Sequence, residues 1–215
     1  GDHRDVLDIG AGNGALSRRC LARPARWLAV EPNVAMGEAL ARLRPQLARD
    51  GVDLAHLATT WQGLPESFCA ESVFAFNLGA THHEADALFD DLVERSRREM
   101  VWVVPAQYGP STFCLAGFLP PELHGADTGP AFERTLAALA REQQPQAIDF
   151  VDWQCRLTFK SRELAVRHFL ERLELASDSA HGRAVADYLD YRLGPGGEEA
   201  RIVCAKRSAV LRWRF

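Results

Sequence analysis

Three glycines and one aspartate near the start of the chain could build a ligand site. Asp8 stands two positions before Gly10, and Gly12 and Gly14 follow at alternate positions. Glycines in this pattern let the backbone turn sharply and approach a bound molecule without side-chain obstruction. A carboxylate beside the turn favours a ligand that carries a cationic group and disfavours a pyrophosphate. The spacing therefore predicts a nucleotide-type site with an electrostatic preference for positive charge.

Apolar residues on both sides of this turn predict the elements that position it. Residues 6–9 suit a buried strand, and apolar residues recur at helical spacing in 15–21. A second apolar run, 27–30, ends at Glu31-Pro32 before another helical pattern. A carboxylate at the tip of a second parallel strand can accept hydrogen bonds from both ribose hydroxyls. Glu31 is therefore a candidate sugar ligand, or otherwise a surface or helix-capping glutamate.

The glycine spacing alone leaves two cofactor classes open, because Gly10-x-Gly12-x-x-Ala15 followed by Glu31 also fits the dinucleotide fingerprint. The whole segment 6–14, Val-Leu-Asp-Ile-Gly-Ala-Gly-Asn-Gly, resembles motif I of class I S-adenosylmethionine (SAM)-dependent methyltransferases. That resemblance implies SAM as the cofactor. The residues that it assigns to SAM here are Asp8, Gly10, Ala11, Gly12, Gly14, Glu31 and Pro32.

The loop after a third expected strand, 52–58, departs from the pattern of this family. Similar methyltransferases often place an acid there that receives the adenine amino group, and this chain has Thr60 instead. A hydroxyl can still accept one hydrogen bond, and Trp61 could lie against the purine. We therefore include Thr60 and Trp61 among the cofactor candidates, while Trp61 suits a packing role equally well.

A polar segment follows the fourth expected strand, 72–76. Ligands of open α/β sheets bind outside the carboxyl ends of the strands, so this loop should border the reacting group. The resemblance implies that Asn77 and Leu78 line the cofactor, and it places His82 and His83 where many relatives carry a histidine. An imidazole, with an ordinary pKa of about 6.5, could take a proton from a substrate hydroxyl. The alternatives are a helix cap and a solvated side chain.

A metal site is not expected. Adjacent histidines cannot easily aim at one ion, and no cysteine or acid stands at ligand spacing near them.

Strands alternating with helical patterns over 215 residues predict a single α/β domain, 1–215. We expect a doubly wound, mostly parallel sheet in three α/β/α layers. The resemblance implies seven strands, with an antiparallel last strand between the fifth and sixth. Residues 105–130 and 161–193 are candidate cap or substrate elements.

Charge and cysteine content narrow the partners and the compartment. The net charge is −4, and Arg95, Arg97 and Arg98 are expected on a solvated helix face, so a nucleic-acid substrate is not indicated. Five isolated cysteines indicate a reduced interior. No segment predicts a membrane span or a signal peptide, and a cytoplasmic location is expected.

The leading prediction is a SAM-dependent methyltransferase that acts on a nucleophilic oxygen or nitrogen of a small molecule. The alternatives are a catalytically inactive methyltransferase-like scaffold subunit that acts with a partner protein, and a nicotinamide-dependent oxidoreductase. Relatives place helices before motif I, whereas the first strand here begins close to Gly1. Either the sequence is trimmed, or later elements, a homodimer or a partner chain cover the pocket.

Overall fold

The computed structural model describes residues 3–78, 84–109, 115–124, 129–193 and 199–215. Its contacts divide the chain into two compact units. The first comprises 1–104, 135–149 and 209–215, and the second comprises 105–134 and 150–208. A single domain was predicted for the chain. The second unit contains both segments that were expected to form caps.

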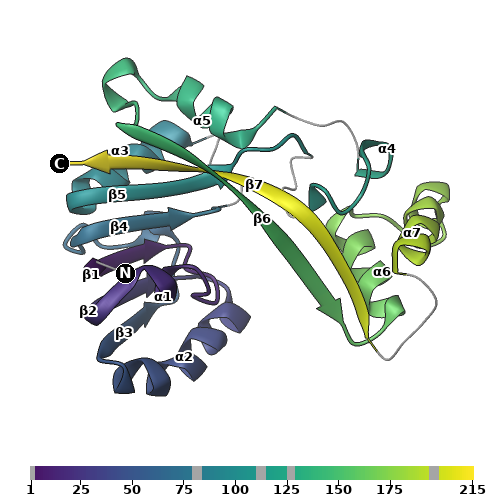
Figure 1. Cartoon of the computed structure of the whole chain (residues 1–215), viewed down its shortest axis with the longest axis horizontal. Coiled ribbons are helices and arrows are strands. Elements are labelled where there is room, and N and C mark those ends of the chain that lie inside the picture. Colours follow the sequence, from purple (N-terminus) through teal and green to yellow (C-terminus); the bar gives the residue numbers. More distant parts are fainter. Residues whose placement is uncertain (1–2, 79–83, 110–114, 125–128, 194–198) are drawn as a thin grey trace. The chain divides into compact units, whose positions relative to one another are not determined.

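Strands and helices alternate through the first part of the chain, as the apolar periodicity predicts (Figure 1). In chain order the elements are β1 His3–Ile9, α1 Ser17–Cys20, β2 Leu21–Val30, α2 Val34–Arg49, β3 Val52–Leu57, η1 Trp61–Gly63, β4 Ala70–Phe76, α3 Ala85–Arg95, β5 Ser96–Pro105, α4 Pro121–His124, α5 Ala131–Ala138, η4 Arg141–Gln143, β6 Ala147–Phe159, α6 Arg162–Arg172, α7 Ala180–Leu193 and β7 Ala200–Arg214.

The strands form one seven-stranded sheet in the order β3-β2-β1-β4-β5-β7-β6. β1 pairs in parallel with β2 and β4, and the β2–β3 and β4–β5 pairs are also parallel. β7 runs antiparallel to β5, since the Ala106 amide donates to the Arg207 carbonyl while the Phe215 amide donates to the Arg98 carbonyl. The predicted fold class, with its last strand inserted between the fifth and sixth, is confirmed.

The core of the first unit holds the ends of β1 and β2 in place. α2 packs against the sheet through Leu40 and Leu47, which belong to one buried cluster with Trp27, Leu54 and Phe74. Of the apolar residues whose spacing predicts this helix, Leu40 is buried, whereas Met36 is 40% exposed. Asn33 caps the helix, because its side chain accepts the Met36 amide at 3.2 Å. The segment that joins Glu31 to α2 is thus tied down at the helix start.

The helix predicted after the glycine turn is much shorter than the periodicity indicated. α1 contains only residues Ser17–Cys20, and Leu21 already belongs to β2. A full crossover between parallel strands takes about a dozen residues or more, and the chain between Ile9 and Leu21 also has to form the turn. The glycine turn therefore packs on the core beneath it and is not followed by a long helix.

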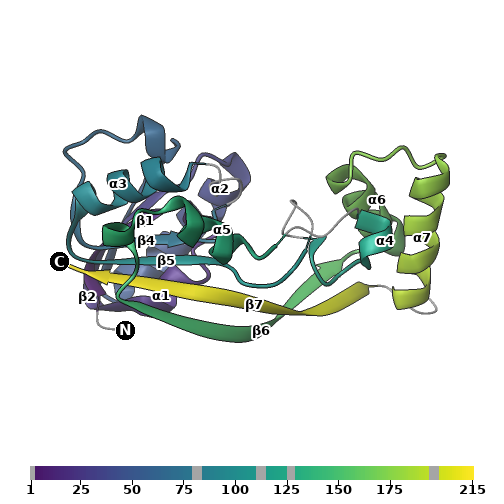
Figure 2. The same ribbon diagram turned by 90° about the horizontal axis from the view of Figure 1, so that it is seen from above.

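α6 and α7 dominate the second unit and lie side by side in both views (Figures 1 and 2). Phe169, Val185 and Leu189 from these helices share a buried cluster with Ile202 of β7. α6 begins after Ser161, whose hydroxyl accepts the Leu164 amide at 3.3 Å. β7 is a long strand that continues from Ala200 to Arg214. Among the described helices, none has the length and apolar character needed to cross a membrane.

Candidate active site

The glycine turn after β1 has the left-handed backbone for which glycine is suited. Gly12 and Gly14 have φ of 56° and 73°. A Cβ added to Gly14 would lie 2.4 Å from Cη2 of Trp27, whereas one added to Gly12 would meet nothing within 4 Å. The two positions therefore have different reasons to be glycine. Gly14 makes room for the buried indole below, and Gly12 leaves open space above the turn.

Glu31 anchors this turn to the tip of β2. Its Oε2 accepts the Gly12 amide and its Oε1 accepts the Asn33 amide, both at 2.8 Å. The parallel register of Ile9 with Val30 brings Gly10 and Glu31 to the same edge of the sheet. Each carboxylate oxygen has lone pairs for a further hydrogen bond. Glu31 is therefore buried and oriented by backbone donors while it keeps acceptor capacity.

Two adjoining hollows lie at the carboxyl ends of β1, β2 and β4. The first, called here the glycine-turn hollow, has a volume of about 510 Å³. Its lining residues are Gly10, Ala11, Gly12, Asn13, Ala15, Leu16, Ser17, Glu31, Pro32, Phe76, Asn77 and Leu78. The second, the Trp61 hollow, has a volume of about 270 Å³. Its lining residues are Ile9, Gly10, Val30, Pro32, Thr59, Thr60, Trp61, Gln62, Leu78 and Glu84.

Leu78 and Asn77 form the border of these hollows at the end of β4. Leu78 lines both hollows and lies directly over Gly10, because a Cβ added there would come within 1.9 Å of Leu78 Cδ2. Asn77 adopts a left-handed φ of 52°, and its amide donates to the Val103 carbonyl at 2.8 Å. Asn77 Oδ1 is buried and accepts no hydrogen bond from any residue that the structure describes. Asn77 therefore lines the glycine-turn hollow and carries a buried acceptor without a partner among the described residues.

Asp8 lies beneath the turn and is fully buried. Trp27 donates from Nε1 to Asp8 Oδ2 at 3.1 Å, while Oδ1 accepts no hydrogen bond within the described part of the chain. Burial raises the pKa of Asp8 to about 7; Ser17 and Trp27 act to lower it, and the negative charge of Glu31 adds to the rise. Asp8 is not among the residues that line either hollow. Any effect on a ligand would act through its charge.

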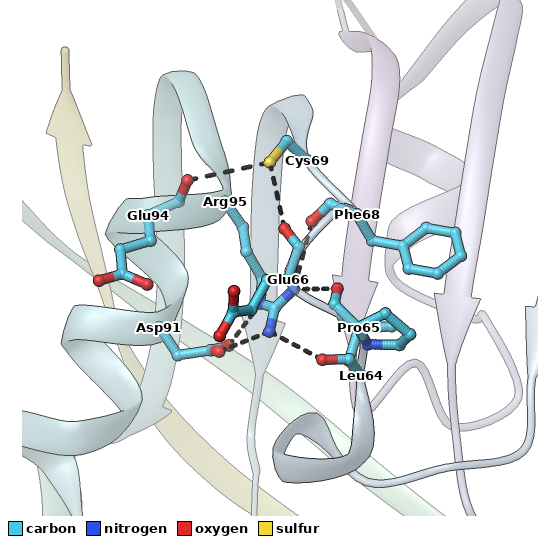
Figure 3. Close-up of polar contacts among 8 residues, drawn as sticks. All are labelled: Leu64, Pro65, Glu66, Phe68, Cys69, Asp91, Glu94 and Arg95. Carbon is cyan, nitrogen blue, oxygen red and sulfur yellow. Dashed lines mark hydrogen bonds and ion pairs between the residues drawn. The ribbon is translucent and has the colours of Figure 1, made fainter.

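Arg95 fixes the chain segment that follows Trp61 (Figure 3). Its guanidinium donates to the carbonyls of Leu64 and Pro65 at 3.1 and 2.8 Å, and to both carboxylate oxygens of Asp91 at 2.7 and 2.8 Å. These bonds join α3 to the segment between η1 and β4. The expectation of a solvated helix face was wrong, because Arg95 is only 4% exposed and because Arg97 and Arg98 belong to β5. Asp91, four residues before Arg95, was the available sequence signal.

The structure brings most of the predicted site residues together. Glu31, Pro32, Asn77, Leu78 and the first residues of the turn line the glycine-turn hollow, and Thr60 and Trp61 line the Trp61 hollow. The roles assigned to these residues, to Asp8 and to Gly14 stay predictions. His82 and His83 lie outside the described residues. The predicted cytoplasmic location and the predicted homodimer or partner chain also stay predictions.

Three supporting residues were not predicted. They are Trp27, Ser17 and Glu84. Within the described residues, no cluster of three or more histidine, cysteine or acidic side chains could hold a metal ion.

No protein-family model and no curated protein sequence matches this chain. Solved structures do resemble it. BH2331 of Bacillus halodurans, described as a methyltransferase, matches with a TM-score of 0.52 and 10% identity over 99% of this chain and 93% of that one. Mycolic acid cyclopropane synthase CmaA1, crystallised with S-adenosylhomocysteine (SAH), matches with a TM-score of 0.50 and 12% identity over 96% of this chain and 77% of that one. The chain has the fold of class I SAM-dependent methyltransferases.

YcgJ of Bacillus subtilis matches over similar lengths, 98% of this chain and 92% of that one, with a TM-score of 0.51 and 16% identity. The likeness extends over both compact units, because each match covers nearly the whole chain. At these identities it establishes the fold alone.

Proposed function

We propose that this protein is a methyltransferase that binds SAM at the ends of β1, β2 and β4 and transfers its methyl group to a small molecule. The observation that carries the proposal is the pair of adjoining hollows around the glycine turn, with Glu31 held in the wall of one by backbone donors. Together their volumes suit a ligand built of a nucleoside and an amino acid.

The residues present fit SAM in shape and in charge. The open space beside Gly12 lets a ligand approach the backbone closely. Glu31 can accept ribose hydroxyls with its remaining lone pairs while the Gly12 and Asn33 amides keep it in place. Glu31 also gives the hollow a negative charge, which attracts a cationic ligand.

SAM itself supplies an activated methyl group on a sulfonium centre. The protein then has to hold the cofactor and the acceptor in line and keep water away, and orientation supplies much of the rate. Of the described residues that line the glycine-turn hollow, Glu31 is the only one with an acidic or basic side chain. A hydroxyl acceptor would need a separate base, for which His82 and His83 are the proposed groups. An amine that enters deprotonated would need none.

An acidic chain with a net charge of −4 supports a small-molecule acceptor better than a polyanionic one. The proposed acceptor atom is a nucleophilic oxygen or nitrogen.

Calorimetric titration with SAM and SAH tests the cofactor site. We expect the wild type to bind both, and Glu31→Gln to weaken binding by about 10-fold to 100-fold, the loss expected for a hydrogen bond to a charged group. Glu38→Gln is the matched control, since Glu38 is an exposed glutamate of α2 paired with Arg42. Equal binding by wild type and Glu31→Gln would contradict the assigned site.

Transfer of labelled methyl from SAM to a panel of small phenols, alcohols and amines tests the reaction. Binding of SAM without transfer to any member would support the scaffold alternative. Binding of NADH in the absence of any affinity for SAM would support an oxidoreductase instead.

A further inference from the structure

The Trp61 hollow combines apolar walls with a polar rim, as a slot for a flat heteroaromatic group would. Val30, Leu78 and Trp61 supply apolar surface, and Thr60 and Glu84 supply hydrogen-bonding groups. Aromatic faces attract flat ring systems, and polar groups at the rim decide which ring edge is accepted. Since this hollow adjoins the glycine turn, it is the natural place for the base of a nucleoside whose sugar is held at Glu31.

Glu84 is the only charged residue among the described residues that line this hollow. It stands at the start of α3, but its side chain does not cap the helix. The Ala87 amide in the first turn is instead taken by Asp86 Oδ1 at 2.8 Å. Within the described part of the chain, no hydrogen bond or ion pair engages the Glu84 carboxylate. An exposed, unengaged carboxylate at the rim of a slot can serve a ligand without first breaking an internal bond.

The chemistry of a carboxylate makes Glu84 selective where its neighbours are not. An ionised carboxylate only accepts hydrogen bonds, whereas the Thr60 hydroxyl and the Gln62 amide can each donate or accept. A ring edge that presents an amino group therefore gains a charge-assisted bond, and one that presents a carbonyl is repelled. Only a base of the first kind satisfies Glu84.

We propose that Glu84 is the residue that selects the base of the cofactor, its carboxylate accepting the exocyclic amino group of an adenine that lies against Trp61. This inference rests on the proposed function. It also accounts for Thr60, which stands where an acid was expected from the third strand. The acceptor comes instead from the start of α3.

The test compares two ligands that differ at this edge of the base. SAH presents an amino group at C6 and an acceptor at N1, whereas S-inosylhomocysteine presents a carbonyl at C6 and an N–H at N1. Dissociation constants for both are measured by calorimetry with the wild type, Glu84→Gln and Glu66→Gln. Glu66 is an exposed glutamate between η1 and β4 that does not line the hollow, so its variant controls for the loss of one nearby charge.

We expect the wild type and Glu66→Gln to prefer SAH by at least about 10-fold, the smallest effect of a lost hydrogen bond to a charged group. Glu84→Gln should reduce this preference to nearly one, because the amide can donate to the carbonyl of the inosine compound. Its melting temperature should match that of the wild type, since the Glu84 side chain is exposed and unengaged.

An unchanged preference in Glu84→Gln would overturn the inference while leaving SAM binding intact. A preference that disappears in Thr60→Val but not in Glu84→Gln would assign the selection to Thr60 instead. If the wild type binds neither compound, the proposed function fails and the inference falls with it. The two failures are therefore distinguishable from one set of titrations.

Discussion

Replacing Asp8 with asparagine should stabilise the protein at alkaline pH and destabilise it at acidic pH. Burial raises the pKa of Asp8 from 3.8 to about 7, so at about 1.4 kcal/mol per unit its ionisation costs about 4 kcal/mol of folding free energy above pH 7. The asparagine side chain cannot ionise, and its carbonyl can still accept the Trp27 N–H. Its amide group replaces an oxygen that lacks a partner, which costs about 1–3 kcal/mol if the amide stays unsatisfied.

The sign follows from proton binding. The folded pKa of Asp8 exceeds the unfolded one, so the wild type keeps this stability below about pH 3.8 and loses it as pH rises to about 7. Between pH 5 and 8, the free energy of unfolding of Asp8→Asn minus that of the wild type should therefore rise by about 3 kcal/mol. The variant should be the less stable protein near pH 4 and the more stable one near pH 8.

Urea unfolding at pH 5, 6, 7 and 8, followed by tryptophan fluorescence, measures this difference directly. The difference in unfolding free energy between the two proteins is taken at each pH. The contributions of titratable groups that both proteins share then cancel. Asp53→Asn, at an exposed position of β3, is the control and should show no such rise. A difference between Asp8→Asn and the wild type that stays level from pH 5 to 8 would refute the reasoning, because Asp8 would then ionise in the fold as readily as in the unfolded chain.

Two further pairs of variants test the glycine turn and the contacts of Arg95. Gly14→Ala should lower the free energy of unfolding by about 2–4 kcal/mol, because its Cβ meets the buried Trp27 at a strained φ. Gly12→Ala should cost only about 1 kcal/mol and mainly weaken SAH binding; equal urea midpoints for the two would contradict this distinction. Arg95→Met should cost about 2–4 kcal/mol by urea unfolding, because it strands Asp91 and two backbone carbonyls. Arg97→Met, on the exposed side of β5, should stay within about 0.5 kcal/mol, and a match between the two arginine variants would count against the Arg95 contacts.

Local patterns predicted most of the fold. The apolar run before Gly10 and the helical spacing after Asn33 depend on chain neighbours, and β1 and α2 form where those patterns place them. The length predicted for the first helix was wrong. Its apolar spacing continues to Leu21, but Leu21 is the first residue of β2. Apolar periodicity does not show where a short helix ends and the next strand begins.

The candidate site was predictable only where one segment carries the whole signal. The glycine turn and Glu31 are visible in the sequence because each stands at the end of its own apolar run. The predicted exposure of Arg95 was wrong because its partners include carbonyls about 30 residues away. A helical pattern of residues does not indicate such distant contacts.

The sequence by itself determined the sharp turn at 10–14 and the acid at the tip of the second strand, since glycine backbone preference and strand patterning are local properties. Only the tertiary structure decided what surrounds them. Parallel pairing sets Val6 opposite Trp27 and Ile9 opposite Val30, which brings an indole to the Asp8 carboxyl and the Gly12 amide to Glu31. It likewise places Glu84 in one hollow with Thr60, because the strands that precede these residues end at the same edge of the sheet.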